Sequence, residues 1–90
     1  MTTDLVARRD AAPVREASLT VAFRDPDGVR TRAFVHGVLT QWRVDPATAA
    51  ETETLAVGMV VRLRPARRHP VELTMRLSRD GASVDVSATR

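Results

Sequence analysis

Residues 29–44, VRTRAFVHGVLTQWRV, carry the pattern from which the sequence predicts a fold. Apolar and polar positions alternate up to Val35, as in a half-buried strand, and the parity of the alternation slips afterwards. A β-bulge at Gly37 would return both halves to one face of a single long strand. Without the bulge, a different set of side chains would point together, namely Phe34, His36, Val38 and Trp42. We adopt the bulge, because a long strand bent at a glycine is a common device of small barrels and coiled sheets.

The segments on either side support a β interpretation. Ahead of this stretch, Leu19, Val21 and Phe23 occupy alternate positions and predict a strand. The tetrapeptide DPDG at 25–28 suits a type I turn, which would join two strands in a hairpin. Behind it, DPATAAETE at 45–53 has an aspartate for an N-cap and a proline at the first helical position, so it predicts one short helix near 46–52.

The C-terminal half continues the two-residue alternation. Strands are predicted over 55–63, over 71–77 and from Val84 onward. Two prolines bound the turn between the first two of these, and RDG at 79–81 is a tight hairpin signal. The predicted fold class is all-β: an antiparallel meander of about five strands forming a small barrel or strongly bent sheet. The predicted domains are a flexible N-terminal arm over 1–14 and a single β domain over 15–90.

A sheet of five strands has a broad apolar face, which one helix of fewer than ten residues cannot cover. The sheet must then close on itself or pack against another chain. The sequence therefore predicts a homo-oligomer, such as a dimer, or a protein partner.

The net positive charge of the chain is weak evidence about its function. The net charge is +3, and all 14 basic residues are arginine, with no lysine, isoleucine, asparagine or tyrosine in the chain. Those four residue types have AT-rich codons, which indicates a GC-rich bacterial genome rather than a selected basic surface. Arginine also raises the pI without adding charge. The distribution is asymmetric, because residues 1–60 have a net charge of −1 and residues 61–90 have a net charge of +4.

The sequence contains no motif that indicates a catalytic, metal-binding or phosphate-binding site. It has no cysteine, no glycine-rich phosphate loop and no metal-ligand spacing, so we predict no catalytic residues, no metal and no cofactor, and the protein is not expected to be an enzyme. His36 and His69 are interpreted as structural or surface residues. No run of about 20 apolar residues occurs, so no membrane association is expected, and the cytoplasm is the expected location.

The most basic stretch is RLRPARRHP, residues 62–70. With one arginine from the following strand it gives the possible contact residues for a partner or a nucleic acid, which are Arg62, Arg64, Arg67, Arg68 and Arg76. Arg30, Arg32 and Arg43 would join them if the bulge is correct. Arginines near strand ends also solvate a surface and discourage edge pairing, without any further role.

The sequence therefore predicts a non-enzymatic binding or scaffolding domain, self-associating or serving as an accessory subunit of a protein assembly. The alternative is a nonspecific nucleic-acid-binding small barrel that uses the basic 62–69 loop. Few aromatic residues are present for stacking bases, which disfavours this alternative. A third hypothesis is a small cyclase-like or isomerase-like enzyme with His36 in a cavity.

Overall fold

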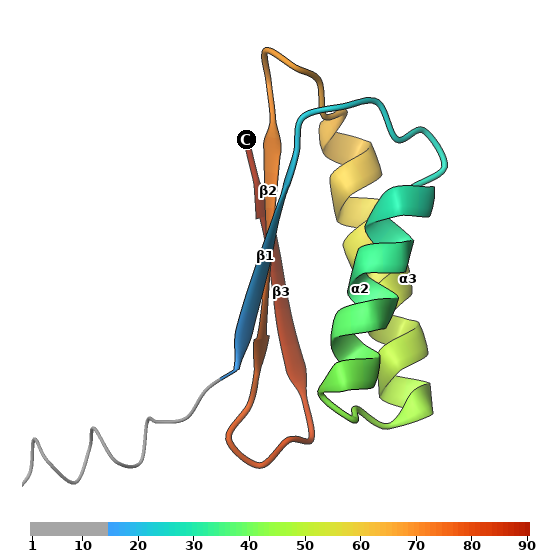
Figure 1. Ribbon diagram of the computed structural model, residues 1–90, viewed down its shortest axis with the longest axis vertical. Coiled ribbons are helices and arrows are strands. Elements are labelled where there is room, and N and C mark those ends of the chain that lie inside the picture. Colours follow the sequence, from blue (N-terminus) through green and yellow to red (C-terminus); the bar gives the residue numbers. More distant parts are fainter. Residues whose placement is uncertain (1–14) are drawn as a thin grey trace, which may run out of the picture.

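A computed structural model describes residues 15–90; the predicted arm over 1–14 lies outside the described residues. The elements are, in order, strand β1 (Glu16–Val21), helix α2 (Val29–Gln41), helix α3 (Pro46–Leu63), strand β2 (Val71–Leu77) and strand β3 (Val84–Thr89). The three strands form one antiparallel sheet in the order β1-β2-β3. The two helices form a second layer over one face of that sheet (Figure 1).

The domain is therefore a mixed α/β fold, and the predicted all-β meander of five strands is wrong. Three predicted strands are confirmed in place as β1, β2 and β3, and the RDG hairpin joins the last two. The segments predicted as a bent strand and as the strand over 55–63 are helical. The sheet is open, with three strands, and does not close into a barrel.

Residues 29–41 form a helix because their buried positions recur every four residues. Thr31, Val35 and Leu39 are buried, and this spacing places them on one face of a helix. The period-two pattern arises because valines and threonines happen to occupy alternate positions, where strands also favour them. Gly37 lies in the middle of α2 and forms no bulge.

Helix α3 begins where the sequence predicts a helix but extends much further. A carboxylate oxygen of Asp45 accepts hydrogen bonds from the backbone N–H groups of Ala47 (3.1 Å) and Thr48 (3.3 Å), which confirms the predicted N-cap. The helix then continues to Leu63, through the segment predicted as a strand. Its buried residues follow the helical repeat: Thr52, Ala56, Val57 and Val60.

The DPDG tetrapeptide forms a turn that starts a helix, not a hairpin. The N–H of Gly28 donates to the carbonyl of Asp25 (2.9 Å), and Gly28 is the N-cap of α2 in the left-handed conformation (φ 65°). The Asp25 carboxylate accepts bonds from the N–H groups of Arg30 (3.2 Å) and Thr31 (2.9 Å), and from the Thr31 hydroxyl (2.9 Å). The aspartate thus satisfies donors that a helix N-terminus leaves free.

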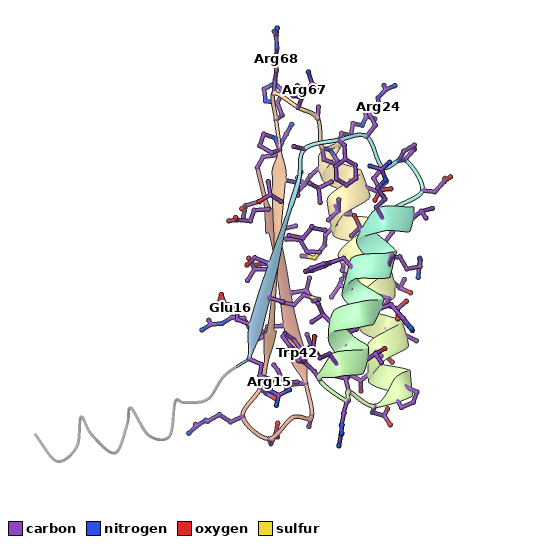
Figure 2. The ribbon with its side chains drawn as sticks, viewed as in Figure 1. Arg15, Glu16, Arg24, Trp42, Arg67 and Arg68 are labelled. Carbon is purple, nitrogen blue, oxygen red and sulfur yellow. The ribbon has the colours of Figure 1, made fainter. Side chains whose placement is uncertain are left out.

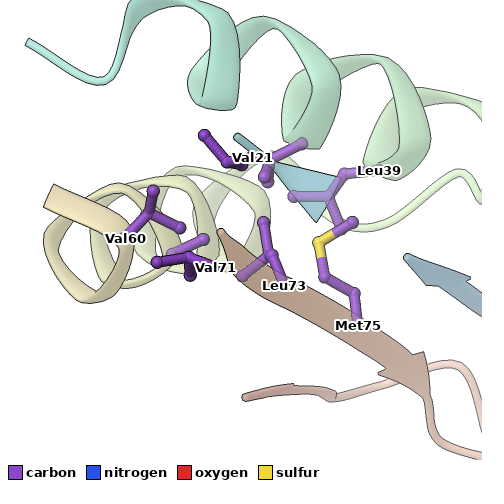
Figure 3. Packing of buried hydrophobic residues seen from close by; sticks show 8 residues of the cluster. Val21, Leu39, Val60, Val71, Leu73 and Met75 are labelled. Carbon is purple, nitrogen blue, oxygen red and sulfur yellow. The ribbon is translucent and has the colours of Figure 1, made fainter. Parts of the chain in front are cut away.

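The core lies between the sheet and the helices and draws on both layers (Figure 3). Leu73 and Met75 of the central strand are fully buried against Leu39 of α2 and Val60 of α3. The complete buried cluster is Val21, Val35, Leu39, Ala56, Val60, Val71, Leu73 and Met75.

The other face of the sheet is polar. Ser18 lies opposite Thr74, and Thr74 lies opposite Ser87, so a row of hydroxyl groups crosses all three strands. Charged residues flank this row: Glu16, Glu72, Arg76 and Asp85. The helices cover the apolar face of the sheet, and the opposite face is polar. The sheet therefore does not need a second chain to cover an apolar face. Oligomerisation stays a prediction. Within residues 15–90, neither helix has the length and apolar character needed to span a bilayer.

Candidate binding surface at the basic end

The topology brings five arginines to one end of the domain. Because successive elements run in opposite directions, β1 ends, α2 begins, α3 ends and β2 begins at the same end. Figure 2 shows Arg24, Arg67 and Arg68 there. We call this surface the basic end and define it by Arg24, Arg62, Arg64, Arg67 and Arg68, all of which are exposed.

A tight turn presents two of these arginines. Ala66 and His69 exchange two backbone hydrogen bonds (3.1 and 3.0 Å), which leaves Arg67 and Arg68 at the tip. Pro65, at the base of the turn, is buried. The turn predicted from the flanking prolines is confirmed, and its tip holds two cations away from the rest of the chain.

Arg64 occupies a backbone conformation that disfavours it. It is the C-cap of α3, with φ 52°, in the left-handed region that glycine adopts most readily. A residue with a Cβ in this region is destabilised by about 1 kcal/mol or more. Strained backbone conformations of this kind are concentrated at functional sites. Here the strained residue places its guanidinium beside Arg24.

The charge of the basic end is not neutralised by neighbouring acids. Among residues 15–90 the ion pairs are Arg32–Glu53, His36–Glu53 and Arg76–Glu16, and none involves the basic end. Asp25 lies close by, but its carboxylate is bound to the first turn of α2. Burial raises the pKa of Asp25, yet hydrogen bonds from Thr31 and Arg30, with the charge of Arg30, outweigh it and leave the pKa below its usual value. The aspartate is therefore ionised near neutral pH, and its carboxylate is already hydrogen-bonded to Arg30 and Thr31.

A hollow lies between the β1–α2 connection and the end of α3. Arg24, Arg64 and Asp25 border it, and Pro26, Val61 and Pro65 give it a largely apolar lining. Beside it, the Arg30 guanidinium stacks over the ring of Phe23, 4.8 Å from the ring centre. The basic end thus combines exposed arginines with an apolar hollow that two of them flank.

The predicted contact residues are only partly brought together. Arg62, Arg64, Arg67 and Arg68 gather at the basic end. Arg76 lies on the outer face of the sheet, where its Nε is 3.5 Å from Glu16 Oε2. Arg24 was missed, because its place beside Arg64 depends on the direction in which α3 returns to the sheet. No local signal in the sequence gives that direction.

The three arginines that the predicted bulge would add, Arg30, Arg32 and Arg43, do not lie together in the structure. Arg32 lies on α2, with its guanidinium 3.7 Å from Glu53 Oε1, and Arg43 lies at the opposite end of the domain from the basic end. Arg30 lies at the start of α2, beside the hollow of the basic end, so the three arginines do not form one surface.

The two histidines differ in their surroundings. His36 Nδ1 lies 2.9 Å from Glu53 Oε2, in a pair that joins α2 to α3 along an open groove. The imidazole side chain is 69% exposed and the glutamate side chain 15% exposed. The enzyme hypothesis requires an enclosed cavity around His36, whereas within residues 15–90 the imidazole lies beside an open groove. His69 is an exposed residue of the basic turn, as expected.

Within the part of the chain that the structure describes, no three acidic or histidine side chains gather where they could hold a metal ion. Comparison with known proteins gives no relative: no family model matches the chain, and no curated protein or solved structure matches it.

Proposed function

We propose that this domain is a non-enzymatic binding module of the bacterial cytoplasm that attaches, through its basic end, to an acidic surface of a partner protein. The observation that carries the proposal is the gathering of five exposed arginines, from three separate segments, at one end of the domain, where two of them flank an apolar hollow and no acidic residue within residues 15–90 forms an ion pair with them. Guanidinium groups pair in a bidentate manner with carboxylates. The hollow offers space for an aliphatic side chain of the partner.

A protein partner fits this surface better than a nucleic acid. A strand of nucleic acid would be expected to continue along the open face of the sheet. That face has three acids, Glu16, Glu72 and Asp85, against the single Arg76, and it has no aromatic side chain on which a base could stack. The five arginines of the basic end are not continued by further arginines along the sheet, apart from Arg76, and the apolar hollow that Arg24 and Arg64 flank has no use in binding phosphates.

The test uses a labelled peptide of alternating glutamate and leucine, with fluorescence anisotropy as the readout. We expect binding that weakens as salt rises, and weaker binding when serine replaces leucine, since the hollow then stays unfilled. An oligonucleotide with the same number of charges is expected to bind more weakly than the peptide.

Two variants assign the binding to the basic end. Arg67→Ala with Arg68→Ala is expected to weaken binding about tenfold, because two solvent-exposed ion pairs are lost. Arg79→Ala, at the opposite end, is the matched control and should leave binding unchanged. Tighter binding of the oligonucleotide that is weakened by Arg67→Ala with Arg68→Ala would replace the proposal by the nucleic-acid alternative. Absence of binding to both probes at low salt would make the basic end a solvated surface.

A further inference from the structure

A second hollow lies at the end of the domain opposite the basic end. It is formed between the C-terminus of α2 and the β2–β3 hairpin, and Trp42 and Arg15 lie at this end (Figure 2). Three arginines surround it, namely Arg15, Arg43 and Arg79, and the chain's single tryptophan lines it. The proposed function makes no use of this hollow.

One wall of this hollow is the β2–β3 hairpin, which its own hydrogen bonds hold in shape. The Ser78 hydroxyl and the N–H of Ala82 (2.9 Å) both donate to the Asp80 carboxylate, and the N–H of Ser83 donates to the Ser78 hydroxyl (3.0 Å). The hydrogen bond from Ser78, with that from Ala82, lowers the pKa of Asp80. The carboxylate is thus ionised but bound within the hairpin, and it forms no ion pair with the arginines.

The opposite wall is the end of α2, which is fixed by a Schellman motif. The N–H of Arg43 donates to the carbonyl of Thr40 and the N–H of Val44 to that of Leu39 (both 3.1 Å), while the N–H of Trp42 donates to that of Val38 (2.9 Å). The carbonyls of Val38, Leu39 and Thr40 are therefore satisfied within the chain. Arg15 is also held in place, because its carbonyl accepts from the N–H of Leu77 (2.8 Å).

Arg43 stands at the position of this motif that favours glycine. Its φ is 57°, so the arginine is kept there against a conformational cost, as Arg64 is at the other end. Its side chain lines the hollow next to Trp42. Trp42 is half-buried and packs against the core, and the accessible part of its side chain lines the hollow among three cations.

From this arrangement we propose that the hollow around Trp42 binds a planar aromatic anion of the nucleotide type, with the base against the indole and the phosphate on the arginines. The arginines favour an anion and the indole favours a planar ring, so together they favour this ligand over a purely aliphatic acid, which would use the arginines alone. The shared chemistry is a base that carries a phosphate, and its source is a free nucleotide or the end of a single strand.

The experiment follows the fluorescence of Trp42, which reports on this hollow alone because the chain has no other tryptophan. The protein is titrated with GMP, and with guanosine and inorganic phosphate as probes of each half of the ligand. We expect a saturable change with GMP and much weaker changes with the two halves. A short oligonucleotide is titrated in the same way, and the tighter of the two ligands identifies the source.

The decisive variant is Arg43→Gly, because it removes the cation while it relieves the backbone strain. We expect the GMP affinity to fall about tenfold in a protein at least as stable as the parent, so unfolding cannot explain the loss. Arg64→Gly is the matched control: it makes the same change in the same backbone conformation at the basic end, and should leave the GMP titration unchanged. No fluorescence change with GMP or with the oligonucleotide, or equal affinities in Arg43→Gly and the parent, would overturn the proposal.

Discussion

Gly28 is the point where the β1–α2 connection touches α3, and its replacement by alanine is the most severe small change that the structure predicts. A Cβ at this position would lie 2.3 Å from Cγ1 of Val57, a stiff branched side chain that is itself buried. The backbone also has φ 65°, which costs a residue with a Cβ about 1 kcal/mol. Overpacking adds about 1–3 kcal/mol. We therefore expect Gly28→Ala to lower the free energy of unfolding by about 2–4 kcal/mol.

The assay is urea denaturation followed by far-ultraviolet circular dichroism, with Val57→Ala and the double variant measured beside Gly28→Ala. Val57→Ala alone is expected to cost about 2 kcal/mol, because it removes two buried methyl groups. In the double variant the collision is gone, so the total loss should be smaller than the sum of the single losses by about 1–2 kcal/mol. Losses that simply add would refute the reasoning, because contact with Val57 would then have no part in the need for glycine.

The same substitution at two other glycines serves as a control with the opposite sign. Gly37 and Gly58 lie inside α2 and α3, and a Cβ at either position would meet no heavy atom within 4 Å. Alanine should stabilise each helix by about 0.5–1 kcal/mol, because glycine loses more conformational freedom on folding. A loss of stability in these two variants would show that the effect at Gly28 is not specific to its contact.

Three further outcomes are expected. Arg43→Gly and Arg64→Gly should each raise the melting temperature, by an amount equivalent to about 0.5–1 kcal/mol, in differential scanning calorimetry; a lower melting temperature in both would contradict the argument from strain. Asp25→Ala should cost about 2 kcal/mol at neutral pH, because it leaves the N–H of Thr31 without its acceptor. The pKa of Asp25 is depressed in the folded chain, so this contribution is present above the unfolded pKa of about 3.9 and is lost as the pH falls through the folded pKa. The free energies of unfolding of the parent and the variant should therefore converge as the pH falls into the acid range. A difference that stays constant with pH would contradict this expectation. Leu73→Ala should cost about 3 kcal/mol in urea denaturation, because the side chain is fully buried in the core, and a loss below 1 kcal/mol would contradict this.

The sequence predicts the strands of this fold and not its helices, for a physical reason. In β1, β2 and β3 one face is buried and the other is solvated, so the alternation of residue types directly reports the strand. Helix α2 shows a false alternation, because valine and threonine, which strands favour, supply part of its buried face. The true repeat at Thr31, Val35 and Leu39 is present in the sequence, but it is obscured by the alternating residues between these positions.

Helix α3 was predicted only at its N-terminus. There Asp45 and Pro46 give a local capping signal that does not depend on the rest of the fold. Further along, an apolar run through Leu63 suits a buried strand and a buried helix equally well, and length alone has to decide between them. The strand prediction for this run required an additional turn near residue 53, and no glycine or proline is present there to make one.

In the candidate sites, too, features set by neighbouring residues could be predicted from the sequence, and features set by distant segments could not. The turn that presents Arg67 and Arg68 is encoded by two nearby prolines and could be predicted. The partnership of Arg24 with Arg64, and that of Trp42 with Arg15 and Arg79, depends on elements that lie far apart in the chain. Both hollows are products of the topology and have no sequence motif.

The pairing of β1 with β2 across two intervening helices also affects how the chain reaches its final state. Ser18 pairs with Thr74, 56 positions away, whereas β2 and β3 form a local hairpin and α2 and α3 lie next to each other in the sequence. Contacts between distant segments form slowly, because a long loop must close before they give any stabilisation. During synthesis on the ribosome, β1 leaves before both of the other strands and has no neighbouring strand until β2 has followed it. Among the three strands, the one made first is therefore expected to be the last to enter the sheet.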